Sequence, residues 1–132
     1  LGICVGMQLL FAESEEFGRY EGVGFFPGKV VRFPGDMPAP GGGVLKVPHM
    51  GWNAVEVLTD HPVLERIPSG TYFYFVHSYY AVPGEPGIAA CRTVYGVPFA
   101  AAVGRGNRLA VQFHPEKSQA AGQQLLRAFL AL

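Results

Sequence analysis

Gly2-Ile3-Cys4-Val5-Gly6, at the start of the chain, is typical of a short strand that turns sharply into a helix, with a cysteine at the turn. A nucleophile on such a turn has strained backbone angles and close neighbours, so we expect the flanking glycines to prevent clashes. The turn also places Cys4 at the amino terminus of the helix, where the dipole favours the thiolate. We therefore expect its pKa to lie below the value of about 8.5 for a free cysteine.

A second motif, Phe113-His114-Pro115-Glu116-Lys117, begins far downstream, with its histidine 110 residues after the cysteine (114 − 4). A histidine can accept the thiol proton and return it to a leaving amine, and a carboxylate can hold the imidazole in the required tautomer. We expect this motif to follow a strand, because ligands bind at the carboxyl ends of strands in α/β sheets. Cys4, His114 and Glu116 are therefore a candidate catalytic triad.

The composition fits one domain of 132 residues and gives no sign of a charged partner. Charged residues make up 15% of the chain, with ten of each sign, which argues against a nucleic-acid-binding or charged membrane surface. The apolar segment 1–12 has no basic residues before it and Glu13 directly after it, so we do not expect a signal peptide. Two cysteines favour a reducing cytosol, and we expect Cys91 to be a buried structural thiol.

Periodicity and turn residues predict an α/β chain with a sizeable antiparallel portion. We expect a helix from Gly6 to about Glu13 and a last helix from about Ser118 to Leu130, with Ser118 as its N-cap. The apolar stripe of the last helix would contain Ala121, Leu125, Leu126 and Phe129. The predicted strands are Lys29–Phe33, Trp52–Leu58, Tyr72–His77 and the hairpin Phe99–Val103 with Leu109–Phe113, and residues 34–43 are predicted to form a loop.

The two motifs, extended to Gly2-Ile3-Cys4-Val5-Gly6-Met7-Gln8-Leu9-Leu10 and Gln112-Phe113-His114-Pro115-Glu116-Lys117-Ser118, resemble those of class I glutamine amidotransferases. Within that class the chain is most similar to the glutaminase subunits of imidazole glycerol phosphate synthases, which act in histidine biosynthesis. The stretches that carry this closer resemblance are Pro48-His49-Met50-Gly51-Trp52-Asn53 and Tyr72-Phe73-Tyr74-Phe75-Val76-His77-Ser78-Tyr79-Tyr80, together with Lys117. The resemblance covers essentially the whole chain.

The resemblance implies a flavodoxin-like fold with a central mixed sheet and a nucleophile elbow. Family members carry further βα units before the elbow, and a glycine-containing loop in that part helps to build the oxyanion hole. At about 30 residues per βαβ unit, roughly 60–80 residues would precede Leu1. We therefore expect residues 1–132 to be the C-terminal two-thirds of an N-terminally truncated glutamine amidotransferase domain.

The resemblance also implies the glutamine-binding residues. Gln8 lies four residues after Cys4, so on a helix it faces the same side, and the family supports contact with the amino-acid head of glutamine. Glu16 would lie near the substrate ammonium group. His77, Ser78 and Tyr79 match the stretch whose backbone holds glutamine in relatives. The backbone N–H of Val5 is the expected oxyanion-hole donor.

A glutaminase of this family passes ammonia to a docked synthase. The resemblance therefore implies a heterodimer with a cyclase subunit, with Tyr74 and Lys117 at the boundary. The turn containing Met50, Trp52 and Asn53 is a further candidate contact, although an ordinary core strand explains the aromatic residues around Tyr74 almost as well. The four histidines are scattered without paired ligand spacing, so we expect no metal and no cofactor.

Three alternatives remain open from the sequence. The chain could serve another synthase of the same class, such as those of anthranilate or guanylate synthesis. It could be a cysteine hydrolase acting on γ-glutamyl peptides without a partner. It could also be a non-catalytic fragment that only binds the synthase or does not fold alone.

Overall fold

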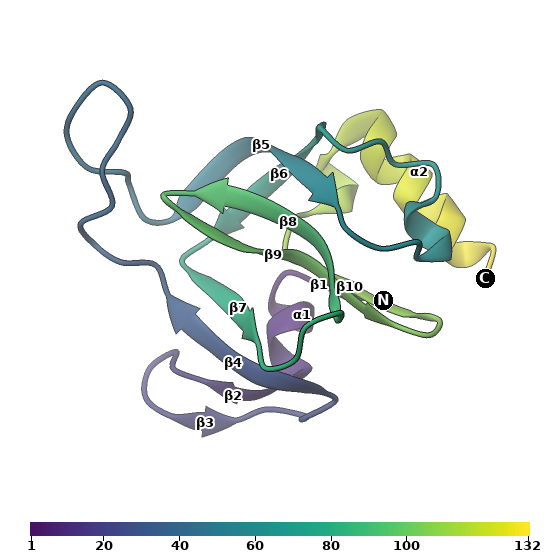
Figure 1. Ribbon diagram of the computed structural model, residues 1–132, viewed down its shortest axis with the longest axis horizontal. Helices are drawn as coiled ribbons and strands as arrows, with labels where there is room; N and C mark the ends of the chain where they lie inside the picture. The colour runs from purple at the N-terminus through teal and green to yellow at the C-terminus, as the bar shows by residue number, and fades with distance from the viewer.

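The computed structural model describes residues 1–132, which form a six-stranded and a four-stranded sheet (Figure 1). Only the pairing of the first strand with the last is parallel in the larger sheet; its other neighbours are antiparallel. The mixed sheet and the α/β class expected from the sequence are therefore confirmed. In spatial order, the larger sheet contains β1 (Gly2–Ile3), β10 (Arg108–Val111), β9 (Val97–Arg105), β8 (Ala89–Tyr95), β5 (His49–Val57) and β6 (Thr71–His77).

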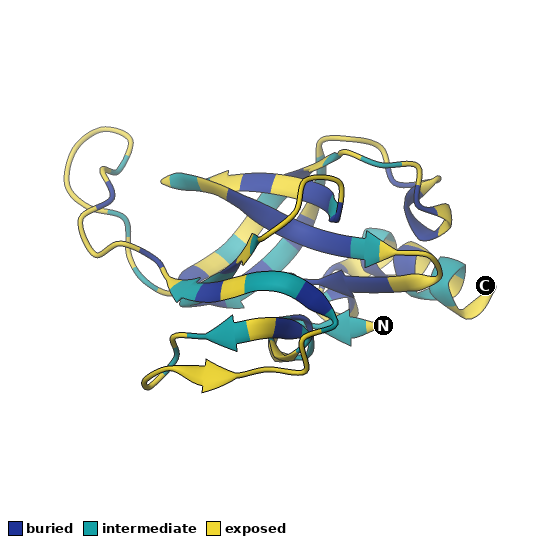
Figure 2. Cartoon of the chain, turned by 60° about the horizontal axis from the view of Figure 1, so that its bottom comes forward, coloured by how far each residue is buried: buried dark blue, intermediate teal, exposed yellow.

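The smaller sheet lies beside α1 and is joined to the larger sheet at the bend between β6 and β7 (Figure 1). Its strands, in spatial order, are β3 (Tyr20–Glu21), β2 (Phe11–Ser14), β4 (Phe26–Arg32) and β7 (Tyr79–Pro83). The helices are α1 (Val5–Leu9), α2 (Gln119–Leu130) and the 3₁₀ turns η1 (Pro62–Leu64) and η2 (Pro115–Lys117). Between β4 and β5 the chain makes a long, mostly exposed loop that projects from the sheets (Figure 2).

The core consists of two apolar clusters, one for each sheet. The larger cluster is rich in aromatic residues, and Phe73 and Phe113 stack within it at 4.1 Å between ring centroids. The smaller cluster packs Met7 of α1 against Phe11 and Phe26 of the four-stranded sheet. Both clusters include residues of β9, because its segment Phe99–Val103 is buried throughout. Both clusters therefore pack against the buried middle segment of β9.

Most of the predicted strands are present, and the hairpin of β9 with β10 has its turn at Gly106-Asn107. Cys91 is completely buried in β8, as expected. The helix expected from Gly6 to about Glu13 is wrong in its second half, because α1 ends at Leu9 and residues 11–14 form β2. A helix of one and a half turns has little stability of its own, and pairing of β2 with β3 and β4 satisfies the backbone of this segment instead.

The last helix follows the prediction in its bounds but not in its cap. Leu125 is buried as predicted, whereas Leu126 is only half-buried and lies outside the core cluster. Ser118 makes no capping bond with its side chain. Its hydroxyl instead donates to the carbonyl of His114 at 2.6 Å and accepts the backbone N–H of Tyr74 at 3.0 Å. Neither helix of the structure is long and apolar enough to cross a bilayer.

Gly122 sets how closely α2 approaches the turn that carries His114 and Glu116. A Cβ added at Gly122 would lie 1.7 Å from the carbonyl oxygen of Pro115, a contact with backbone that cannot move aside cheaply. Glycine in a helix interior normally costs about 0.5–1 kcal/mol relative to alanine. Its presence here therefore indicates a packing requirement that outweighs helix propensity.

We expect Gly122→Ala to destabilise the full-length protein by about 1–3 kcal/mol, because the added methyl group overpacks the contact with Pro115. Denaturant unfolding followed by circular dichroism measures this change. Gln123→Ala, at the next and exposed position of the same helix, is the matched control and should leave the midpoint nearly unchanged. A Gly122→Ala protein as stable as the wild type would contradict the assigned packing role.

Candidate functional site

The elbow is present as a strand, a strained residue and a helix in direct succession. Cys4 has φ 50° and ψ −108°, outside the regions that non-glycine residues normally occupy. Its backbone N–H donates to the carbonyl of Val111 at 2.8 Å, which attaches the turn to the end of β10. A Cβ at Gly2 would lie 3.1 Å from Gly6 and from Ala110, so the space at the first flanking glycine is tight, as expected. The same expectation is wrong for Gly6, where a Cβ would meet nothing within 4 Å.

The histidine and the glutamate of the second motif are joined by a hydrogen bond. His114 Nδ1 lies 2.5 Å from Glu116 Oε1, which leaves the Nε2 atom of the imidazole available for another partner. The backbone of His114 is fixed at both ends, since its N–H donates to the carbonyl of Tyr74 at 2.8 Å and its carbonyl accepts the Ser118 hydroxyl. The side chain of His114 is mostly buried, whereas that of Glu116 is 47% exposed.

The Cys4 thiol is surrounded by hydrogen-bonding groups but makes no hydrogen bond to His114 in this structure. Gln112 Nε2 lies 3.7 Å from the sulfur, and the thiol lies 3.9 Å from the carbonyl oxygen of Val76. Burial raises the pKa of Cys4 above its usual value, and hydrogen bonds from the Val5 N–H and from Gln112 lower it by less. The expected lowering of the pKa is therefore wrong, because desolvation outweighs the hydrogen bonds from Val5 and Gln112 that favour the thiolate.

Gln112 is a site residue that the sequence analysis missed. It is completely buried directly after β10, and its two amide atoms contact two different candidate residues. Its nitrogen approaches the Cys4 sulfur, while its oxygen accepts the side-chain N–H of Gln8 at 3.1 Å. A buried amide must have its hydrogen bonds satisfied, so this side chain fixes the position of Gln8 relative to the thiol. The signals in the sequence were its place at the start of the motif Gln112–Ser118 and its position directly after an apolar strand.

The candidate glutamine-binding residues lie around the same thiol. Gln8 reaches the bend between the two sheets, where its Nε2 donates to the carbonyl of Tyr79 at 3.0 Å. His77 is buried and its Nδ1 lies 2.8 Å from the same carbonyl oxygen. The carbonyl of Ser78, between them, accepts the backbone N–H of Phe33. Glu16 is half-buried after β2, and its charge contributes to the raised pKa of Cys4.

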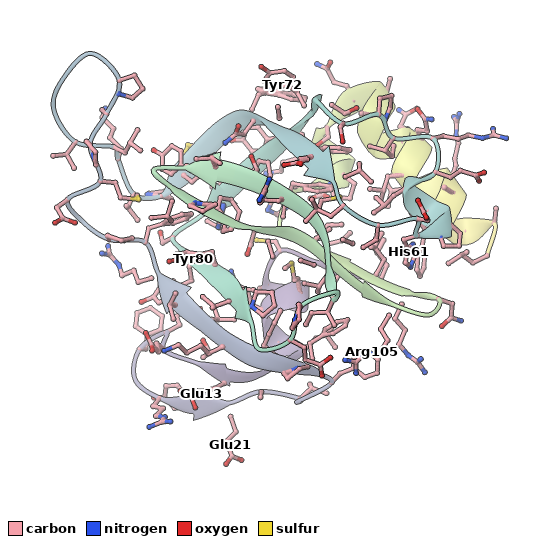
Figure 3. The ribbon with its side chains drawn as sticks, viewed as in Figure 1. Glu13, Glu21, His61, Tyr72, Tyr80 and Arg105 are labelled. Carbon is pink, nitrogen blue, oxygen red and sulfur yellow. The ribbon has the colours of Figure 1, made fainter.

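Four of the candidate partner residues, Met50, Trp52, Tyr74 and Lys117, lie with Tyr72 on a largely exposed face of β5, β6 and η2, which we call the aromatic face. The rings of Trp52 and Tyr74, which are directly opposed in the strand register, meet edge to face at 6.1 Å. The Lys117 ammonium lies over the Tyr74 ring at 5.9 Å from its centroid. Tyr72, which the sequence did not indicate as a partner residue, is 60% exposed on the outer side of the β5–β6 pair (Figure 3).

Asn53 does not lie on this face, although the sequence grouped it with Met50 and Trp52. Side chains alternate along β5, so Asn53 lies on the opposite side of the strand from Trp52. Its Nδ2 donates to the carbonyl of Val94 at 2.9 Å, and its Oδ1 accepts the N–H of Ala54. The hydrogen-bonding capacity of its side chain is therefore used within the chain. The structure contains no group of three or more His, Cys, Asp and Glu side chains that could hold a metal ion.

The two cysteines should differ in how their alkylation depends on pH. Because the raised pKa leaves Cys4 as a neutral thiol at pH 7, its reaction with iodoacetamide should be slow there and rise roughly tenfold per pH unit to beyond pH 9. Burial raises the pKa of Cys91 to about 12, so this thiol should stay unmodified in the folded protein. Peptide mapping after timed alkylation measures both rates. A Cys4 rate already constant at pH 7 would mean that the helix terminus, and not burial, controls this thiol.

Comparison with protein families gives one match that covers the chain. The family model described as glutamine amidotransferase class-I matches residues 1–132. Proteins named imidazole glycerol phosphate synthase subunit HisH are also similar. Those of Syntrophotalea carbinolica and Methylococcus capsulatus are each 54% identical, over 129 and 131 residues. The alignments cover 98% of this chain but only 62% and 60% of these relatives, so the chain spans about three-fifths of their length.

Solved structures with the same fold are more distant in sequence. A putative GMP synthase protein from Thermoplasma acidophilum superposes with a TM-score of 0.64 at 24% identity, covering 98% of this chain and 54% of that one. A glutamine amidotransferase from Thermotoga maritima gives a TM-score of 0.59 at 16% identity, over 98% and 46% of the two chains. At these identities the similarity establishes the fold.

Proposed function

Because the chain belongs to the class-I glutamine amidotransferase family, we propose that it carries the glutaminase centre of an imidazole glycerol phosphate synthase. The observation that carries the proposal is the strained elbow at Cys4, attached by its N–H to the β10 strand that leads to the His114–Glu116 pair. The 54% identity to proteins of that synthase supports the choice of enzyme within the family. The chain would act in the cytoplasm.

In the proposed reaction, Cys4 Sγ attacks the side-chain amide carbon of glutamine. Its proton passes to His114 Nε2, because Nδ1 is held by Glu116. The N–H of Val5, the residue directly after the nucleophile, would stabilise the oxyanion of the tetrahedral intermediate. The carbon–nitrogen bond then breaks, and the imidazolium protonates the leaving nitrogen to give ammonia and a γ-glutamyl thioester.

In the second half of the reaction, water attacks the thioester carbon while His114 takes a proton from the water. The carbon–sulfur bond breaks, glutamate leaves and the thiol of Cys4 recovers its proton. The raised pKa of Cys4 supports this assignment, since a neutral thiol requires a general base at the moment of attack. Gln8, Glu16 and the bend at residues 77–79 would bind the amino-acid head of glutamine.

Ammonia would pass to a cyclase partner that makes imidazole glycerol phosphate and aminoimidazole carboxamide ribonucleotide. The aromatic face supports docking of such a partner, because exposed Trp and Tyr side chains flanked by a cation are typical of interface hot spots. Met50 is 62% and Trp52 is 47% exposed there. This face lies on the same strand β6 whose end carries the proposed glutamine contacts. Asn53 would support the interface from behind β5.

Glutamine labelled with ¹⁵N at its side-chain amide tests the glutaminase proposal. The full-length protein with its cyclase should release labelled ammonia, and Cys4→Ala should abolish release. His114→Asn should lower the rate by about 10²–10⁴, the usual contribution of a general base, and Glu116→Ala by less. Cys91→Ala is the matched control, since that thiol is completely buried in the core and has no part in the proposed mechanism.

Equal release by the wild type and by Cys4→Ala would refute the assignment of the nucleophile. Full-rate turnover without any synthase partner would instead favour a partner-independent γ-glutamyl hydrolase. Ammonia transfer to an anthranilate or guanylate synthase, with none to the cyclase, would replace the proposed partner while leaving the glutaminase chemistry intact.

The aromatic face makes its own prediction about the partner. Trp52→Ala should weaken cyclase binding by about 2 kcal/mol or more, and Lys117→Ala by less, because a central aromatic residue contributes most of the energy at an interface. Titration calorimetry measures both affinities. Phe17→Ala is the control, because Phe17 is 88% exposed but lies in the turn between β2 and β3, two strands of the smaller sheet. If Phe17→Ala weakened binding as much as Trp52→Ala, the partner would dock elsewhere.

A further inference from the structure

Two buried histidines outside the proposed triad contact each other beneath the glutamine-binding bend. His49 on β5 and His77 on β6 are opposed in the strand register, are 3% and 6% exposed, and lie 2.9 Å apart from Nδ1 to Nε2. The His49 ring is stacked between those of Tyr95, at 4.1 Å, and Phe75, at 4.8 Å. The imidazole side chains of both histidines take no part in the proton transfers described above, so their burial needs a separate explanation.

The partners of the two rings determine where each proton lies. Burial lowers the pKa of His49 to about 3 and that of His77 to about 4, so both rings are neutral near pH 7. A carbonyl oxygen only accepts hydrogen bonds, so His77 Nδ1 carries its proton toward Tyr79, at 2.8 Å. His77 Nε2 is then an acceptor, and His49 Nδ1 must be the donor to it. His49 Nε2 in turn accepts the N–H of Asn53 at 3.3 Å.

The hydrogen bonds of Asn53 agree with this direction. Its nitrogen also faces the carbonyl of Val94 at 2.9 Å, and its oxygen faces the N–H of Ala54 at 2.9 Å. The amide therefore has one possible orientation, with its nitrogen toward His49. We call this chain of hydrogen bonds the histidine relay. Asn53 donates to His49, His49 donates to His77, and His77 donates to the Tyr79 carbonyl.

Tyr79 begins β7, directly after the bend at which the chain leaves the larger sheet for the smaller one. Its carbonyl oxygen accepts one hydrogen bond from His77 and a second from Gln8 Nε2, at 3.0 Å. A carbonyl has two lone pairs, so both are occupied and the oxygen is fixed from two sides. Gln8 also donates to Gln112, whose nitrogen approaches the Cys4 sulfur. The relay therefore ends two side chains away from the thiol.

We propose that the histidine relay is a positioning device that holds the Tyr79 carbonyl, and through it Gln8, in the geometry that binds the amino-acid head of glutamine. The assignment of a binding role to Gln8 rests on the proposed glutaminase function. The relay touches neither the thiol nor His114 by hydrogen bonds, so it acts on binding of the substrate head and not on the reacting atoms. Loss of the relay should therefore raise KM for glutamine more than it lowers kcat.

The test compares two variants of nearly equal size in the full-length protein with its cyclase. His77→Leu removes the donor to Tyr79, whereas His77→Asn keeps a side-chain N–H near the former Nδ1. A neutral hydrogen bond contributes about 0.5–1.5 kcal/mol, so His77→Leu should raise KM about two- to thirteenfold, with kcat changed less than about twofold. His77→Asn should restore most of the affinity. Asn53→Leu, at the far and half-buried end of the relay, should raise KM by a smaller factor.

His61→Asn is the control for loss of a buried imidazole. His61 caps η1 with Nδ1 and lies on the side of the molecule near α2 (Figure 3), and an asparagine keeps a capping oxygen. The KM of His61→Asn for glutamine should equal that of the wild type. An unchanged KM in folded His77→Leu would overturn the proposal. The proposal would also be overturned if His77→Leu and His77→Asn both lost kcat and affinity equally and both had a lower Tm. That result would show a merely structural role for His77.

A spectroscopic measurement tests the relay even if the glutaminase proposal fails. Long-range ¹H–¹⁵N correlation on protein labelled in its histidine rings should show His49 and His77 at pH 7 as neutral rings, each protonated at Nδ1. Protonation of either ring at Nε2, or a charged ring, would contradict the relay. If the wild type released no ammonia from glutamine but both rings were protonated at Nδ1, the glutaminase proposal would be wrong and the geometry of the relay would be right.

Discussion

The parallel pairing of β1 with β10 is the constraint on which the site depends. Gly2 and Ile3 are paired with Ala110 and Val111, and the N–H of Cys4 continues the pairing onto the Val111 carbonyl. The chain leaves β1 into the elbow and leaves β10 into the turn of His114 and Glu116, so one edge of the sheet carries both halves of the proposed triad. Such pairing joins residues from opposite ends of the chain, and its entropic cost is met by burial of the intervening antiparallel strands.

A second constraint is the bend between β6 and β7, where the chain passes directly from the larger sheet into the smaller one. The larger sheet positions Tyr74, which holds the backbone of His114, and the smaller sheet begins with Tyr79, which holds Gln8. The aromatic face and the proposed glutamine contacts are thus two surfaces of the same strand. β6 is the edge strand of the larger sheet, and its alternate side chains Phe73, Phe75 and His77 are buried in the core, so a change on its outer surface has little room to be absorbed on the inner one.

The sequence alone predicted the features that are formed by residues close together in the chain. The elbow, the hairpin of β9 with β10 and the His114–Glu116 pair each lie within a short stretch, and the structure has all three. The spacing of Met7, Leu10 and Phe11 fits a helix that continues past Leu9, and only pairing with β3 and β4 makes residues 11–14 a strand. The sequence predicts a lowered pKa for Cys4 from its position at a helix terminus. The pKa is raised instead because the side chain is buried, and burial depends on the whole fold.

Interactions between distant residues were out of reach for the same reason. Gln112 contacts Cys4 from 108 residues away, and His49 meets His77 across 28 residues, so no spacing rule indicates either contact. The position of Ser118 suits a helix cap, whereas the fold uses its hydroxyl to join Tyr74 to His114. Direct sequence patterns therefore identified reactive groups, and the structure identified the residues that hold them in place.

The central claim is that the elbow makes Cys4 the acyl acceptor from glutamine. Acid quenching of the full-length protein and its cyclase during steady-state turnover of glutamine, followed by peptide mass spectrometry, tests it most directly. We expect the peptide containing Cys4 to gain the mass of one γ-glutamyl group, as a thioester that hydroxylamine removes, with Cys91 unmodified. Ammonia release without any γ-glutamyl adduct on Cys4, or with the adduct on another residue, would contradict the account.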